Sequence, residues 1–94
     1  MEYEFTKSFD KDLESYKHDR EFLRLLGGKV NEIGRANSFE DITGLVPIRG
    51  RETHYRFKIK TRKTTYRVGI KLLSNRIWFA RLDKDKRRFY KRFK

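Results

Sequence analysis

The sequence predicts an α+β domain, in which a mostly antiparallel sheet of about four strands carries two N-terminal helices on one face and a short C-terminal helix. Three observations predict this class. Apolar residues follow helical spacing in the first half of the chain. In the second half they alternate with charged residues, and short turns separate the alternating stretches, as in antiparallel strands. The 94 residues have the length of one domain, which we expect to span 1–94.

The first half predicts a short strand followed by two helices. The stretch EYEFT at 2–6 alternates and is typical of a strand. A helix is expected from about Ser8, with Ser8 or Thr6 as its N-cap. A second helix is expected over 21–36, where four apolar residues share one stripe: Phe22, Leu26, Val30 and Ile33.

Beyond the helices, residues 36–50 contain Gly44, Pro47 and Gly50 and predict a connection. Three strands then follow, over 54–60, 66–72 and 76–82, with turns at 61–64 and 74–75. The last stretch, KDKRRFYKRFK, is too polar for a central strand. Phe89 and Phe93 lie four residues apart in it and predict a short helix lying on the sheet.

The alternation assigns opposite characters to the two faces of this sheet. The face expected under the helices carries the apolar residues Tyr55, Phe57, Ile59, Tyr66, Val68 and Ile70. The other face carries the cations Arg56, Lys58, Lys60, Arg67 and Lys71 together. Lys58 and Lys60 lie about 6–7 Å apart along one strand. Like charges on neighbouring strands cost stability, so we expect these cations to serve a function.

The net charge of +12 belongs wholly to the second half of the chain. Residues 1–48 hold 7 Lys and Arg against 10 Asp and Glu, whereas residues 49–94 hold 18 against 3, a net charge of +15. A field this one-sided attracts polyanions, and nucleic acid or a ribonucleoprotein is the favoured partner.

Several classes of site are not supported by any motif. Cysteine is absent, and His18 and His54 have no companion ligands at metal spacing, so we expect no metal and no small-molecule cofactor. The GGK at 27–29 lacks the spacing of a phosphate-binding loop. No apolar run has the length of a signal peptide or a transmembrane helix. We therefore expect a cytoplasmic protein without membrane contact.

The remaining Lys, Arg and Tyr residues suit cleavage of RNA by its own 2′-hydroxyl. Arginine matches phosphate oxygens and stays protonated, so it stabilises charge. A lysine acts as a base only if its pKa falls, and Lys58 and Lys60 supply like-charged neighbours for each other. Tyrosine stacks on a base or relays a proton. From composition alone, phosphate binding without chemistry explains the same residues.

The whole arrangement resembles the RelE/ParE superfamily of toxins from bacterial toxin–antitoxin systems. The resemblance covers most of the chain: the opening YEFTKSFDKDL, the paired helices, the loop ending at Gly50, the stretch YRFKIKTRKTTYRVGI, and the closing KDKRRFY. It implies a RelE-like antiparallel sheet flanked by helices. Where many relatives have Gly-Asp before the Tyr-Arg pair, this chain has Thr64–Thr65.

For the RelE branch, the resemblance implies a ribosome-dependent mRNA endonuclease that inhibits translation and growth. Lys58 and Lys60 then match lysines of proton transfer and charge stabilisation, and Arg67 matches the arginine that holds the cleaved phosphate. Tyr90 matches a tyrosine that orients or activates the cleaved nucleotide. One basic residue of 84–88 would match a further phosphate contact or acid. The residues expected to contact RNA or the ribosome are Arg56, Lys71, Arg81, Lys84, Lys86, Arg87 and Arg88.

The resemblance also implies a cognate antitoxin as partner, with an acidic segment that folds on the toxin. Two alternatives stay open. The ParE branch shares the fold but inhibits DNA gyrase, and a non-catalytic basic module would bind RNA without cutting it.

Overall fold

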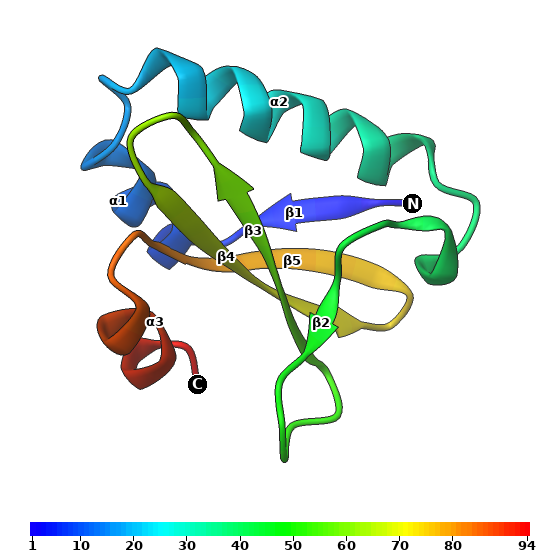
Figure 1. Ribbon diagram of the computed structural model, residues 1–94. Coiled ribbons are helices and arrows are strands. Elements are labelled where there is room, and N and C mark those ends of the chain that lie inside the picture. The colour runs from blue at the N-terminus through cyan, green and yellow to red at the C-terminus, as the bar shows by residue number, and fades with distance from the viewer.

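A computed structural model describes all residues from 1 to 94 and has an α+β architecture built on one five-stranded sheet (Figure 1). The sheet has the strand order β1-β5-β4-β3-β2. Its strands are β1 (Tyr3–Phe5), β2 (Val46–Pro47), β3 (His54–Lys60), β4 (Thr65–Leu73) and β5 (Arg76–Asp83). The α+β class is therefore confirmed, and the three long strands occur where the alternation predicts them.

The strand count and the pairing of the first strand differ from the prediction. The sheet has five strands, because Val46–Pro47 pairs with β3 inside the stretch predicted as a connection. It is also mixed, because β1 runs parallel to β5. A parallel pair needs a long crossover, and here residues 6–75 lie between its two strands. The proline lies on an edge strand, where its missing N–H does least harm.

Helices α1 (Lys7–Glu14) and α2 (Arg20–Arg35) begin at side-chain caps. Thr6 accepts a hydrogen bond from the Phe9 N–H, and Asp19 accepts one from the Phe22 N–H. Both caps satisfy backbone donors that the first helical turn leaves unpaired. Figure 1 shows α2 crossing one face of the sheet. No helix has the length and apolar character needed to cross a membrane.

The main core lies between these helices and the sheet. It is a cluster of fourteen buried residues, and its largest completely buried side chains include Phe9, Phe22, Phe57, Phe79 and Ile33. The predicted apolar face is confirmed, since Phe57, Ile59, Tyr66, Val68 and Ile70 all belong to this cluster. Burial of aromatic and aliphatic side chains on this scale is the main stabilising contribution.

Helix α3 (Lys86–Arg92) lies on the opposite face of the sheet (Figure 1). Phe89 and Phe93 are 0% and 4% exposed but do not belong to the main core cluster. Phe93 lies over Gly69, where an added Cβ atom would come within 2.7 Å of its ring. The glycine therefore provides the space that lets the C-terminal aromatic residues pack on the cationic side of the sheet.

A β-bulge in β5 determines which of its side chains share that side. Gly69 is opposite Arg81 and Ile70 is opposite Phe79, so Ala80 is an extra residue. The extra residue shifts the alternation, and Arg81 and Asp83 consequently lie on the same face as α3.

Candidate functional site

The cations of β3 and β4 gather on one face in a defined register. Lys58 is opposite Arg67, Arg56 is opposite Gly69, and Lys60 is opposite Thr65. Side chains at directly opposed positions have Cβ atoms about 4.5–5.5 Å apart. We call the group of Arg56, Lys58, Lys60 and Arg67 the cationic face. The structure thus brings together three of the four residues predicted to be catalytic.

Arg67 lies in the middle of this face, between Lys58 on β3 and Asp83 on β5. Its Nε is buried and has no hydrogen-bond partner in the protein. The carboxylate of Asp83 bonds to Arg88 and Arg92 instead. A guanidinium that no carboxylate pairs with, beside other cations, suits an anionic ligand such as a phosphate.

Lys58 is exposed, and its neighbours lower the pKa of its ammonium group. The charge of Arg56 is the largest cause, followed by the charge of Arg67, partial desolvation and the charge of Lys60. Each of these disfavours the protonated amine. The lowered pKa makes the neutral form that a base needs more accessible at Lys58.

The fourth predicted residue, Tyr90, reaches this face from α3. Arg56 Nε donates a hydrogen bond of 2.8 Å to the Tyr90 hydroxyl oxygen. The Tyr90 ring makes an edge-to-face contact with Phe89 at 5.1 Å, while 39% of the residue is exposed. The sequence assigned Arg56 only to RNA backbone contact. Its bond to Tyr90 joins residues 34 positions apart, and no local pattern could indicate it.

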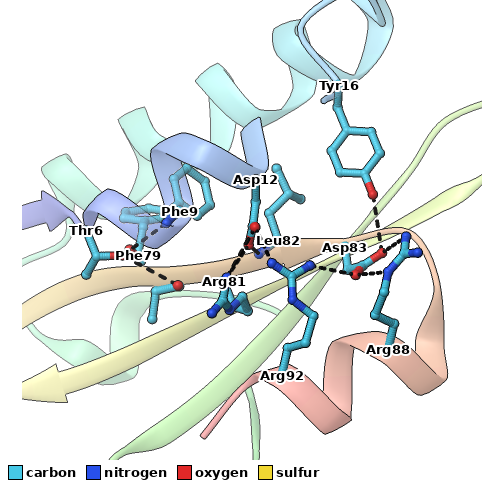
Figure 2. A network of polar contacts seen from close by, with 11 residues as sticks. Thr6, Phe9, Asp12, Tyr16, Phe79, Arg81, Leu82, Asp83, Arg88 and Arg92 are labelled. Carbon is cyan, nitrogen blue, oxygen red and sulfur yellow. Dashed lines mark hydrogen bonds and ion pairs between the residues drawn. The ribbon is translucent and has the colours of Figure 1, made fainter. Parts of the chain in front are cut away.

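A buried carboxylate, Asp83, anchors α3 beside the cationic face (Figure 2). It accepts hydrogen bonds of 2.7 and 2.9 Å from Arg88, of 3.2 Å from Arg92 and of 3.2 Å from the Tyr16 hydroxyl. Burial alone would raise the pKa of Asp83, but the hydrogen bond from Arg88, the backbone N–H of Asp85 and the guanidinium charge outweigh it. Together they lower this pKa to about 2.

A second buried carboxylate, Asp12 of α1, binds the edge of β5 beyond the stretch that pairs with β1. It accepts hydrogen bonds from the Leu82 N–H at 3.0 Å, from Arg81 at 3.2 Å and from Arg92 at 2.6 Å. Figure 2 shows Arg92 reaching from α3 between the two carboxylates. Arg92 thus connects α3 with both α1 and β5. The sequence did not indicate this role.

The residues predicted to contact RNA or the ribosome fall into three groups. Arg81 and Arg88 form ion pairs with Asp12 and Asp83, so their first role is structural. Apart from Arg56, which bonds to Tyr90, the remaining residues split between the exposed start of α3 and the far end of the sheet. Lys84, Lys86 and Arg87 are exposed at or before the first turn of α3, while Lys71 is opposite Trp78.

No known family model, curated protein or solved structure matches the chain.

Proposed function

We propose that this protein is a RelE-like mRNA endonuclease that cleaves messages bound to the ribosome. The observation that carries the proposal is the convergence of Lys58, Arg67 and Tyr90, from β3, β4 and α3, on one exposed surface. These residues supply the three functions that cleavage by the 2′-hydroxyl requires: a base, charge stabilisation at the phosphate, and a hydroxyl group for proton transfer.

In the proposed reaction, the neutral amine of Lys58 takes the proton of the 2′-hydroxyl. The 2′-oxygen attacks the adjacent phosphorus, and the bond from phosphorus to the 5′-oxygen breaks. The products are a 2′,3′-cyclic phosphate and a 5′-hydroxyl end. Arg67 binds the phosphate oxygens, where charge develops in the transition state, and Lys60 adds positive charge to the same surface.

The ribosome contributes positioning in this proposal. A few exposed cations do not hold a flexible RNA in one geometry. Fixing the reacting groups in a near-attack geometry can lower the activation barrier by roughly 7–11 kcal/mol. The net charge of +15 in residues 49–94 suits a surface of ribosomal RNA. Lys84, Lys86 and Arg87 are exposed at or before the first turn of α3 and are the proposed contacts to that surface. With this function we propose a cytoplasmic location and an acidic antitoxin as the inhibitor.

Primer extension on an mRNA in a purified translation system tests the proposal. We expect cuts when ribosomes are present and none on the same mRNA without them. An intact message in both reactions would exclude the endonuclease. A loss of gyrase supercoiling would then support the ParE-like alternative, and salt-sensitive RNA binding without a cut would support the non-catalytic one.

A further inference from the structure

The hydrogen bond between Arg56 and Tyr90 determines that the Tyr90 hydroxyl acts as an acceptor towards Arg56. A guanidinium only donates hydrogen bonds, so the Tyr90 oxygen is the acceptor in this 2.8 Å contact. The O–H proton of Tyr90 is not used there and has no acceptor within the protein. It is consequently free to be donated to a ligand on the cationic face.

Two other tyrosines of the chain show the opposite arrangement. The Tyr16 hydroxyl donates to Asp83 at 3.2 Å, and the Tyr66 hydroxyl donates to Asp19 at 2.6 Å. In both, burial and the neighbouring carboxylate raise the pKa of the phenol. Tyr16 and Tyr66 therefore retain their protons in structural bonds, whereas Tyr90 is paired with a cation.

We propose that Arg56 positions Tyr90 as the proton donor to the departing 5′-oxygen of the cleaved RNA. This rests on the proposed endonuclease function and assigns the acid that the function needs. Arg56 is a positioning residue, because it acts through Tyr90. The ring contact with Phe89 and the ion pairs of Arg88 and Arg92 with Asp83 hold the phenol in place from the α3 side.

The proton and electron balance of this step closes within the site. As the bond from phosphorus to the 5′-oxygen breaks, its electron pair stays on that oxygen, which takes the Tyr90 proton. The resulting phenolate lies against the Arg56 guanidinium, whose charge stabilises it. The proton that Lys58 took from the 2′-hydroxyl then returns to Tyr90 through water, and both groups regain their starting states.

A substrate that needs no acid provides the sharpest test. Two ribosome-bound messages are compared, one with the normal 5′-oxygen at the cut and one with sulfur in its place. A thiol has a pKa of roughly 8.5, so a thiolate leaves without being protonated. The enzymes are wild type, Tyr90→Phe, Arg56→Lys and the double variant. Arg56→Lys keeps a cation beside Lys58 but places a methylene group near the position of the arginine Nε.

With the oxygen message, we expect Tyr90→Phe and Arg56→Lys each to slow cleavage about 100-fold, the low end for general acid catalysis. The double variant should be no slower than Tyr90→Phe. With the sulfur message, all three should cut within about threefold of wild type, since the acid is no longer needed. Arg24→Lys is the matched control, because Arg24 is exposed on α2 across the other face of the sheet.

Two results would overturn this assignment while leaving the endonuclease intact. One is a variant that stays equally slow on both messages, because the lost function would then not be protonation of the leaving group. The other is a Tyr90→Phe enzyme that cuts the oxygen message at the wild-type rate. If wild type cuts neither message, the proposed function itself fails. Tyr90→Phe removes one oxygen from an exposed side chain, so folding is not at risk.

Discussion

Lys58 lies directly opposite Arg67 in the pairing of β3 with β4, with no acidic side chain between the two cations. Opposed like charges destabilise a sheet, and here Arg56 adds a third charge, two residues from Lys58 along β3. The same arrangement lowers the pKa of Lys58, and the buried Nε of Arg67 has no hydrogen-bond partner. The unfavourable repulsion is thus concentrated where it supports the proposed chemistry.

The first prediction concerns the pH dependence of cleavage. If Lys58 is the base, the rate rises with pH as its ammonium loses a proton. Arg56 is the largest cause of the lowered pKa, so Arg56→Gln should raise that pKa and move the rising limb to higher pH. A pH–rate profile under single-turnover conditions measures the shift. Arg24→Gln should leave the limb in place, and an unmoved limb in Arg56→Gln would exclude Lys58 as the base.

The second prediction concerns the anchor of α3. Asp83→Asn removes the charge that pairs with Arg88 and Arg92. Breaking a buried ion pair costs about 3–5 kcal/mol, and the partly exposed arginines reduce the expected loss in unfolding free energy to about 2 kcal/mol. Urea unfolding measures it. Asp10→Asn is the control, because Asp10 is exposed on α1. Equal stabilities of the two variants would contradict the anchoring role.

The third prediction concerns stability at low pH. The pKa of Asp83 is lowered from 3.8 to about 2 in the folded protein. Its contribution is therefore complete above the unfolded value and is lost as pH falls from 3.8 towards 2. Thermal unfolding at pH 5 and pH 2.5 should show a smaller loss of Tm for Asp83→Asn than for wild type. An equal loss of Tm in the two proteins would show that Asp83 does not cause this dependence of stability on pH.

The fourth prediction compares two glycines. Gly69→Ala places a Cβ atom 2.7 Å from the Phe93 ring, and we expect a loss of about 1–3 kcal/mol as the C-terminal aromatic residue is displaced. Gly28→Ala has nothing within 4 Å of its Cβ, and alanine is favoured in a helix by about 0.8–1 kcal/mol. The two substitutions should therefore change the urea midpoint in opposite directions. A stabilising Gly69→Ala would mean that Phe93 does not pack there.

Periodicity predicted much of this fold correctly. Alternation in 54–60, 66–72 and 76–82 was sufficient to predict the long strands and to separate the apolar face from the cationic face. The turn at Ser74–Asn75 was also predicted, and both residues have the positive φ angles of a two-residue hairpin loop, 52° and 59°. These features depend on neighbours in the sequence, which is why local patterns contain them.

The features that the sequence did not reveal depend on contacts between distant residues. The parallel pairing of β1 with β5 joins Tyr3–Phe5 to Ile77–Phe79, far apart in the sequence, and the two-residue β2 is too short for alternation to show. The bulge at Ala80 reverses the faces of Arg81 and Asp83 without a local signal. The bond from Arg56 to Tyr90 and the role of Gly69 both require knowing where α3 lies.

The central claim is that Arg67 binds the phosphate that is cut, and single-turnover cleavage of a ribosome-bound message tests it most directly. Wild type, Arg67→Ala and Arg24→Ala are compared at equal concentration on the same message. We predict a loss of about 100-fold or more for Arg67→Ala, as for other groups that stabilise transition-state charge, and a change within about twofold for Arg24→Ala. Cleavage by Arg67→Ala at the wild-type rate would contradict the proposed site.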